Sequence, residues 1–294
     1  MANTLGGINL AQIANESLST LLAEMQPLNA FTTDFSSDVA DKGESVSTRV
    51  ATAVTAGDAT SGYSATDVTS TAKTVSLSNH VHFTAGFTDL EISKGGFDML
   101  ERTFIRPAVH SVANKMMDDT LALVTNANFS NNTVVTSGDF DADDAADLAK
   151  SLTTQNTMKS GRSMIIGPSY YAALAKDNAI QAAYAFGGSE AIRENEVPRV
   201  HGFDVYEYTD IPDNSENLEG IVCSQEGVIL AARQPSLPQN WFGDVESVTE
   251  PNSGLTLQYR SWYEGKDGKQ YITCTLIYGV AVGVAENVHR ILSA

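Results

Sequence analysis

The chain has little positive charge. Its 294 residues contain 18 Lys and Arg against 36 Asp and Glu, which gives a formal net charge of −18 at pH 7. The basic residues are scattered singly along the chain, whereas a nucleic-acid surface needs them clustered on one face. The sequence therefore predicts no direct binding of DNA or RNA.

Long apolar runs are also absent. The longest, residues 276–285, has ten residues and includes two glycines, whereas a transmembrane helix needs about twenty apolar residues. Residues 1–5 lack the basic segment and the apolar stretch that are typical of a secretory signal. We expect no contact with a membrane, and a chain that stays in the compartment where it is made.

Cysteine is rare. The two cysteines, Cys223 and Cys274, lie in the apolar, β-like contexts Ile-Val-Cys-Ser and Ile-Thr-Cys-Thr. A disulfide needs an oxidising compartment, which no other feature of the sequence indicates. We expect two buried, reduced thiols.

The sequence contains no motif that is typical of catalysis or of cofactor binding. It has no Gly-x-Gly-x-x-Gly, no Walker phosphate loop, no Gly-x-Ser-x-Gly and no Cys-x-x-Cys. Gly187-Gly188-Ser189 resembles a phosphate cradle, but a loop after the Ala-rich residues 179–186 accounts for it. We predict a protein that is not an enzyme, with no catalytic residue, no cofactor and no metal site.

The acidic run at residues 139–144 resembles the start of a calcium-binding loop. Counting Asp139 as position 1 places Asp144 where that loop needs glycine, and Lys150 where it needs a bidentate glutamate. The spacing therefore excludes this type of calcium site. We expect the acids to cap the first turn of the helix that follows, where negative charge is favourable.

The five histidines show no metal-binding pattern. His80 and His82 would point to the same side of a strand, but no third ligand is nearby, so a solvated or subunit-contacting face explains them better. His110, His201 and His289 lie far apart and have no Glu-x-x-His or His-x-x-x-His spacing. We interpret these three as structural.

A long segment rich in Ser and Thr is predicted to form a polar ribbon of two strands. Residues 32–78 contain 19 Ser or Thr among 47 residues, so they cannot bury a core of their own. Alternating β-branched and apolar residues over 46–54 and 75–83, around a glycine-marked tip at 56–62, predict two paired strands. Because an isolated ribbon is marginal in water, we expect something outside this stretch, such as another subunit, to cover it.

Helical periodicity marks two segments. Residues 8–25 carry apolar side chains with a helical period and end before Pro27. Residues 97–126 carry a second stripe and would form a strut about 45 Å long, kinked or divided at Pro107. The second stripe comprises Phe97, Leu100, Phe104, Val109, Val112, Met116, Leu121 and Val124.

The rest of the chain mixes helices and strands. We expect helices over residues 142–158 and 168–174, the second opened by Pro168. The order of elements predicts an α+β fold built from discontinuous segments. The expected strands are residues 163–166, 203–208, 221–223, 228–231, 255–263 and 270–284, the last two flanking a turn at 265–268.

Five stretches in the correct order resemble the major capsid proteins of tailed bacteriophages, which have the Hong Kong 97-type capsid fold. Together they span about residues 8–292. Residues 104–118 are similar to the spine helix of that family, with its Arg-Pro-Ala at residues 106–108. The other stretches are residues 161–170, 200–212 with Gly-Phe-x-Val-Tyr at 202–206, 227–235, and the pair 255–260 and 278–282.

The resemblance implies a division of the chain into four parts. In this family the A-domain meets its copies around five-fold and six-fold axes, and the extended E-loop lies over a neighbouring subunit. A neighbouring subunit is also what the uncovered ribbon needs. The implied parts are an N-terminal arm at 1–31, an E-loop at 32–85, a P-domain with the spine helix at 86–132 and 235–270, and an A-domain at 133–234 and 271–294.

One branch of the family cross-links its subunits through an isopeptide bond between Lys and Asn, formed with a catalytic acid. Lys42 and Lys73 are the only lysines in the ribbon. No motif ties either lysine to a particular asparagine. We therefore expect subunits that are held together without covalent bonds.

The function that the resemblance implies is that of a major capsid (head) protein, which self-assembles through hexamers and pentamers into an icosahedral shell around double-stranded DNA. Its partners would be further copies of the chain, a scaffolding protein, a portal and a decoration protein. The DNA would be enclosed rather than bound, because net-negative subunits repel it. The protein would be assembled in the cytoplasm of a host bacterium and end in the virion.

Two alternatives belong to other classes of protein. An encapsulin-like nanocompartment uses the same fold to enclose protein cargo, but the 30-residue opening segment and the long ribbon favour the phage protein. A Ser/Thr-rich adhesin or tail-tube component would have a signal peptide or strands throughout. The helical stripe over residues 97–124 argues against the second alternative.

Overall fold

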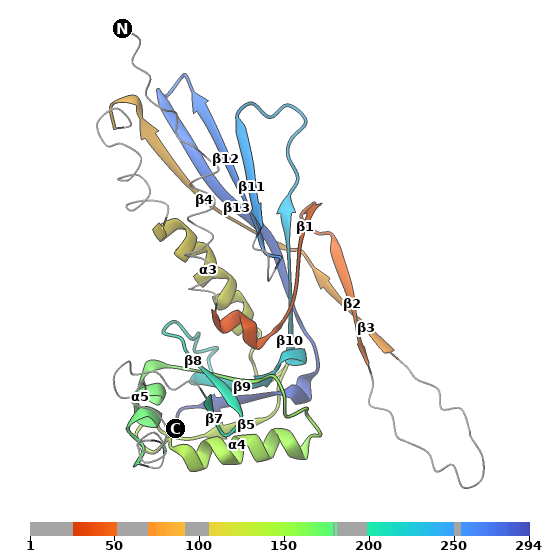
Figure 1. The fold of residues 1–294 in the computed structure, drawn as a ribbon, viewed down its shortest axis with the longest axis vertical. Coiled ribbons are helices and arrows are strands. Elements are labelled where there is room, and N and C mark those ends of the chain that lie inside the picture. The colour runs from red at the N-terminus through yellow and green to blue at the C-terminus, as the bar shows by residue number, and fades with distance from the viewer. Residues whose placement is uncertain (1–25, 52–69, 92–105, 179, 181–198, 250–253) are drawn as a thin grey trace, which may run out of the picture.

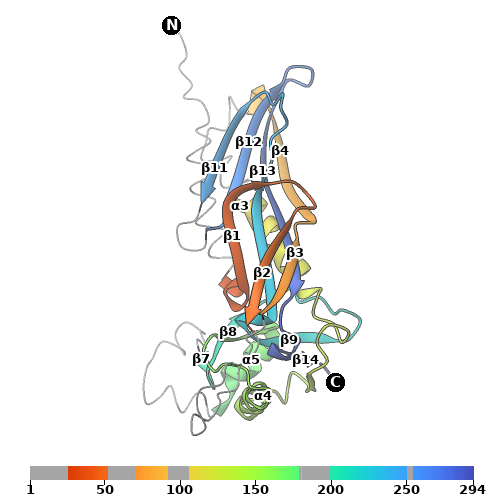
Figure 2. The ribbon, with the colours of Figure 1, turned by 90° about the vertical axis from the view of Figure 1, so that its right-hand side faces the viewer.

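The computed structural model describes residues 26–51, 70–91, 106–178, 180, 199–249 and 254–294. These residues form an elongated molecule with a long sheet at one end and a short sheet with two helices at the other, and a two-stranded ribbon leaves the body at the side (Figures 1 and 2). None of the helices in the described part is long and apolar enough to cross a membrane.

The long sheet has six strands, with β13 at its centre. One edge of β13 pairs with β12 and then with β10, and the other edge pairs with β4 over ten consecutive residues. β1 adds to β10 in parallel, and β11 forms the edge beyond β12. The strands are β1 (Thr32–Ala40), β4 (Asn79–Thr88), β10 (Val228–Pro235), β11 (Asp244–Thr249), β12 (Thr256–Glu264) and β13 (Lys269–Val282).

The short sheet also has six strands, in the order β5-β14-β9-β6-β8-β7. It mixes parallel and antiparallel pairs, since β6 is parallel to β8 and antiparallel to β9. The strands are β5 (Asn132–Val134), β6 (Arg162–Ile166), β7 (Arg199–Val200), β8 (Phe203–Glu207), β9 (Leu218–Ser224) and β14 (Val288–Leu292). Both faces of this sheet are covered by other parts of the chain.

Helix α3 (Arg106–Leu121) packs on one face of the long sheet. Alternate residues of β13 point to this face, as expected from the two-residue period of a strand, and are buried in one cluster with the helix. The core also includes the short helix η1 (Gln26–Ala30) and extends to one face of the short sheet. Its members on β13 and α3 include Ile272, Cys274, Leu276, Tyr278, Val112, Ala113, Met116 and Met117.

Helices α4 (Ala142–Thr154) and α5 (Pro168–Lys176) cover the other face of the short sheet. Their apolar residues are buried against alternate residues of β6 and β8, among them Met164 and Phe203. Short 3-10 helices complete the fold: η4 (Gln225–Gly227) between β9 and β10, and η5 (Ala285–Asn287) before β14.

Several elements differ from those expected. The expected strand over residues 75–83 is two strands, because β3 (Ser70–Ser76) pairs with β2 (Ser45–Ala51) while β4 pairs with β13. The chain changes partner at Leu77 and Ser78. The expected helix over 142–158 ends at Thr154, and that over 97–126 ends at Leu121.

Some expectations lie outside the described residues. These are the helix over residues 8–25, the ribbon tip at 56–62, the glycines at 187–188 with Ser189, and the first part of the strut helix, which includes Phe104.

The sheets divide the chain differently from the four expected parts. β1 and β4, which fall in the expected E-loop at 32–85, belong to the long sheet. β10 and most of β13, which fall in the expected A-domain, belong to the long sheet as well, and the expected boundary between residues 270 and 271 lies inside β13. The reason is that β13 is one continuous strand with partners along both edges, which a boundary drawn from sequence blocks does not reveal.

Candidate assembly surfaces

The ribbon of β2 and β3 stands apart from the two larger sheets. Among the described residues, β2 and β3 form a sheet of their own, in register from Ser45 opposite Ser76 to Ala51 opposite Ser70. Figures 1 and 2 show this pair leading away from the long sheet. A two-stranded antiparallel sheet leaves one edge of each strand without a backbone partner, so the ribbon offers two edges to a neighbouring molecule.

The base of the ribbon is firmly attached. Leu77 exchanges backbone hydrogen bonds with the turn before β2: Gly43 N donates to its oxygen at 2.9 Å, and its own N donates to Glu44 O at 2.8 Å. Gly279 on β13 lies so close to the Ser76 carbonyl oxygen that a Cβ there would collide with it. A small buried cluster seals the junction; it comprises Ala40, Val75, Leu77, Ile229, Ala231 and Ile277. The direction in which the ribbon leaves the body is therefore set by the fold.

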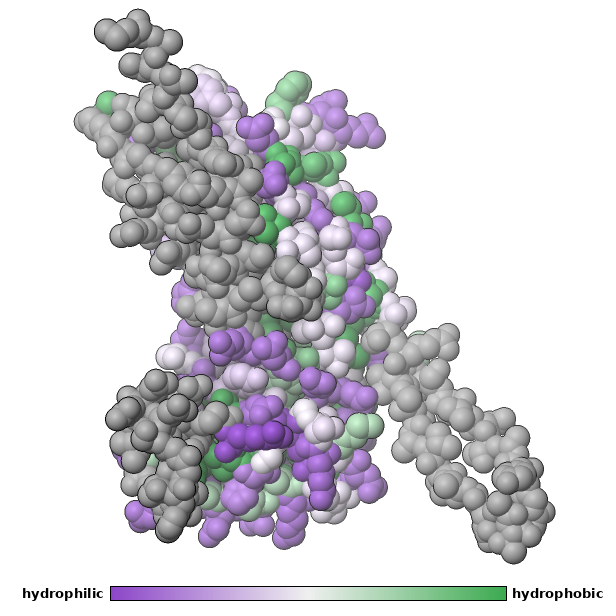
Figure 3. All heavy atoms as spheres, viewed as in Figure 1, coloured by the Kyte–Doolittle hydropathy of each residue, from purple (hydrophilic) through white to green (hydrophobic). Residues whose placement is uncertain are grey.

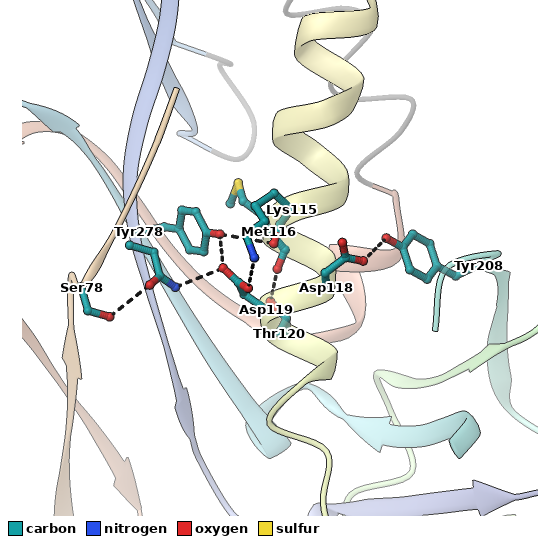
Figure 4. A network of polar contacts seen from close by, with 9 residues as sticks. Ser78, Lys115, Met116, Asp118, Asp119, Thr120, Tyr208 and Tyr278 are labelled. Atoms are coloured by element: carbon teal, nitrogen blue, oxygen red, sulfur yellow. Dashed lines mark hydrogen bonds and ion pairs between the residues drawn. The ribbon is translucent and has the colours of Figure 1, made fainter. Parts of the chain in front are cut away.

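A polar network joins α3 to the long sheet (Figure 4). The Tyr278 hydroxyl donates a 2.6 Å hydrogen bond to Asp119 Oδ2, and Lys115 Nζ lies 2.7 Å from Asp119 Oδ1. Asn79, the first residue of β4, donates to Asp119 Oδ2 at 3.3 Å. Burial, together with the bond to Asp119, raises the pKa of Tyr278 well above its usual value. One carboxylate thus links the helix, the central strand β13 and the start of β4.

The neighbouring carboxylate faces the short sheet. The Tyr208 hydroxyl, just after β8, donates to Asp118 Oδ1 at 3.1 Å (Figure 4). Burial raises the pKa of the Asp118 carboxyl, although the bond from Tyr208 works against this shift. Burial also raises the pKa of Tyr208. α3 is therefore bonded to both sheets through two consecutive residues.

The C-terminal end of α3 is capped by a distant loop. The last carbonyl groups of a helix have no partner inside it, and here Asn214 Nδ2 donates to Leu121 O at 2.9 Å and to Val124 O at 2.8 Å. Asn214 has φ of 51°, a left-handed conformation that Asn tolerates better than most residues. The loop that leads into β9 thus completes the end of α3.

An ion pair fixes the same loop to the short sheet. Arg290 on β14 is buried and pairs with Glu216, and its Nη2 donates to Asn126 Oδ1 at 2.9 Å. Glu216 also accepts a 2.8 Å hydrogen bond from Asn126 N. A buried arginine is stable only when its charge is compensated. The two sheets and the ribbon base are consequently held in one arrangement around α3.

The residues singled out by sequence have structural roles. Asp141 caps α4 and accepts hydrogen bonds at 3.0 Å from Asp143 N and Asp144 N, which confirms the expected role of the acidic run. Cys223 and Cys274 are free and buried, also as expected, and burial raises the pKa of each thiol to about 12.

The histidines are dispersed. His80 Nε2 lies 2.8 Å from Thr275 Oγ1, and the side chain of His82 is exposed. His289 is buried between hydroxyl groups, with Nε2 2.8 Å from Thr133 Oγ1 and Nδ1 3.0 Å from Ser151 Oγ. His110 and His201 are exposed. Within the described ranges, no three His, Cys, Asp or Glu side chains are placed to hold a metal ion.

Four features of the structure were not predicted. Asn214 and Arg290 act through partners far away in the chain, so no local pattern marks them. β1 is largely polar, with Asp34, Ser36, Ser37 and Asp38 among its nine residues, and its composition gives no strand signal. The exposed loop after β10 could have been found from its apolar residues, which follow a proline-marked break.

Comparisons with known proteins identify the fold. No protein-family model matches the chain, and no curated protein sequence does. Among solved structures, the capsid of the cyanophage P-SCSP1u matches with a TM-score of 0.60 and 12% identity over 90% of this chain and 86% of that one. A structure from the Mycobacterium phage Che8 matches with a TM-score of 0.53 and 17% identity over 85% of each chain.

A further match comes from a virus-like particle of Pyrococcus furiosus, with a TM-score of 0.55 and 12% identity over 96% of this chain and 98% of that one. These likenesses extend over nearly the whole length of each chain. The α+β fold expected from the sequence, of the Hong Kong 97 type found in tailed-phage capsids, is thereby confirmed.

Proposed function

We propose that the chain is the major capsid (head) protein of a tailed bacteriophage, which self-assembles through hexamers and pentamers into an icosahedral shell that encloses double-stranded DNA. The observation that carries the proposal is the ribbon β2–β3, which is fixed at its base and whose strands pair only with each other among the described residues, in a chain with a capsid fold. A neighbouring subunit would supply the contacts that the ribbon lacks in a single chain.

The other parts of the chain have corresponding roles in this proposal. The short sheet with α4 and α5 is the region that meets its copies around the five-fold and six-fold axes, and the long sheet with α3 forms the wall between them. Further partners are a scaffolding protein, a portal and a decoration protein. With a net charge of −18, the subunits repel DNA at short range, so the genome is enclosed rather than bound.

In this role the chain has no reaction to catalyse. It is assembled in the cytoplasm of the host bacterium and becomes part of the virion. The subunits are joined by surface contacts rather than by covalent bonds.

Assembly of the purified chain tests the proposal. We expect concentrated full-length protein, alone or with a scaffolding partner, to give pentamers, hexamers or closed shells in sedimentation velocity and negative-stain electron microscopy. A protein that stays a folded monomer at every concentration, with and without the partner, would contradict the proposal.

Shortening the ribbon tests its role. Deleting residues 57–67, which lie outside the described residues, leaves β2, β3 and the cluster at the ribbon base intact. Shorter loops change the closure entropy only slightly, so we expect unchanged circular dichroism and melting of the subunit, and shells that are rare or aberrant in size. A matched variant replaces the same residues by a Gly/Ser linker of equal length and separates the effect of length from that of side chains.

A second candidate function is an encapsulin-like shell around protein cargo. The match to the virus-like particle of Pyrococcus furiosus over 98% of that chain favours it. The two functions differ in what purified particles contain. Particles from the native cells should protect double-stranded DNA from nuclease if the first function holds, and should contain a second protein without DNA if the alternative holds.

A further inference from the structure

The loop between β10 and β11, residues 236–243, presents apolar side chains to solvent. Its eight residues carry no charge, and seven of them are exposed. Phe242 is 86% exposed and Leu237 42% exposed. In Figure 3 hydrophobic residues reach the surface over the upper end of the molecule, where the long sheet lies. Large apolar side chains exposed on a surface are typical of a contact site.

The loop rests on a ladder of aromatic rings on the face of the long sheet that points away from α3. The Trp241 ring meets the Trp262 ring edge-on at 5.4 Å, and Trp262 stacks on Tyr271 at 5.3 Å. Tyr271 lies against Gly86, where an added Cβ would collide with the ring. Arg260 lies 5.5 Å from the centre of the Trp241 ring. Such contacts between rings and with a cation are favourable, so the loop has a firm support.

The two ends of the loop are fixed in different ways. Arg260 Nη2 donates to Ser236 O at 3.2 Å, and Gly243, with φ of 141°, lies so close to Ser261 O that no Cβ fits there. Trp241 Nε1 is buried and has no hydrogen-bond partner among the described residues. A buried donor without an acceptor is costly.

Electrostatics indicates what binds there. Each copy carries a net charge of −18, so two copies repel one another wherever acidic surfaces meet at less than a Debye length, roughly 8–10 Å. An uncharged apolar segment with an arginine beside it is a place where a second acidic copy can approach closely. Residues 236–243 therefore meet both conditions for close contact with a second copy: they carry no acidic charge, and they expose apolar area.

We propose that loop 236–243 is a contact surface through which one copy of the chain binds a second copy, with Phe242 and Leu237 buried against the neighbour. The proposal rests on the proposed function, because it names one of the contacts through which the shell forms. The ring ladder holds Trp241 below the loop surface while the two apolar side chains project from it.

The test compares the double variant Leu237→Ser/Phe242→Ser with the control Leu90→Ser in the full-length chain. Leu90 is 63% exposed and follows β4 of the long sheet, outside both the loop and the region proposed to meet its copies around the symmetry axes. Because a few central apolar side chains dominate a protein interface, we expect the double variant to need a roughly tenfold or higher protein concentration for assembly. Its melting temperature as a subunit should be unchanged, and the control should assemble like the wild type.

Cross-linking gives an independent readout. Phe242→Cys adds one exposed thiol to a chain whose own two cysteines are both buried. A maleimide photo-cross-linker therefore attaches selectively at residue 242. Cross-links from residue 242 to a second copy support the proposal. Cross-links to an unrelated protein, or none between copies, overturn it.

The outcome also separates this proposal from the proposed function. If the wild type assembles and the double variant assembles equally well, the loop proposal is wrong while the capsid function stands. If the wild type itself never assembles under any condition, the capsid function fails and the loop proposal fails with it.

Discussion

Asp118 and Asp119 are consecutive residues of α3, yet their carboxylates bond to tyrosines from different sheets. Asp118 accepts from Tyr208 at 3.1 Å, next to the short sheet, and Asp119 accepts from Tyr278 at 2.6 Å, in the long sheet (Figure 4). Successive residues on a helix point about 100° apart, so one turn of α3 can contact two bodies. One short stretch of α3 therefore makes hydrogen bonds that help to fix the position of both sheets.

Replacing Tyr278 by Phe should weaken the subunit. The change removes the hydrogen bond to Asp119 and leaves a partly buried carboxylate with fewer donors, which typically costs about 1.5–3 kcal/mol for a bond to a charged group. The pKa of Tyr278 is raised in the folded state, so its bond contributes fully below pH 10 and is lost as the pH rises further. Urea unfolding at pH 7 and pH 10.5 measures both effects.

Tyr263→Phe is the matched control for this variant. Tyr263 donates a 3.0 Å hydrogen bond to Asp89, but its side chain is largely exposed. Its removal should leave the free energy of unfolding unchanged at pH 7. Equal losses of unfolding free energy in the two variants would mean that the hydrogen bond from Tyr278 stabilises the fold no more than an exposed one.

Asn214→Gly should loosen the end of α3. Glycine adopts the positive φ of this position without strain, so the variant reports the loss of two hydrogen bonds to Leu121 O and Val124 O, about 1–2 kcal/mol, together with the greater freedom of glycine in the unfolded chain. Asn214→Ala should cost about 1 kcal/mol more, because alanine is strained at positive φ. Thermal unfolding of both variants measures the two contributions, and a fully stable glycine variant would show that the cap is dispensable.

Acid should destabilise the short sheet through His289. Burial lowers the pKa of His289. As the pH falls, His289 therefore becomes protonated in the unfolded chain before it does so in the folded chain. The stability due to its neutral form is present above about pH 6.5 and is lost as the pH falls through the folded pKa. His289→Gln should therefore show a weaker loss of melting temperature than the wild type between pH 7 and pH 5. Identical slopes would exclude this residue as a cause.

Met116→Ala should strongly destabilise the subunit. Met116 is fully buried between α3 and the long sheet, and such large-to-small changes typically cost about 2–5 kcal/mol. Met158→Ala makes the same chemical change at a side chain that is 69% exposed and should have little effect. Chemical unfolding of the two variants compares them directly. A stable Met116 variant would mean that α3 does not pack on the sheet in this way.

Local rules predicted the parts of the fold that depend on neighbouring residues. Pro168 opens α5 and Asp141 caps α4 as expected. The alternation along β13 also holds, since Ile272 and Cys274 point to the core while Tyr271 and Thr273 lie on the other face. These features arise within a few residues of the chain, where side-chain spacing and capping preferences act.

Long-range pairing was not predictable in the same way. β1 adds to β10 in parallel although it lies almost two hundred residues earlier in the sequence, and its polar residues favour no strand on their own. The cap of α3 by Asn214 and the contact of Trp241 with Trp262 likewise depend on segments that the fold brings together. For the same reason, the boundary expected between residues 270 and 271 lies inside β13.

The central position of β13 has a mechanical consequence. With fourteen residues at about 3.3 Å each it measures roughly 46 Å, and it is bonded along both edges to β4, β12 and β10. Tension along this strand acts in shear on many backbone hydrogen bonds at once, because three neighbouring strands share the load. The ribbon has only the pairing between β2 and β3 to share a load, so we expect it to yield before the long sheet does.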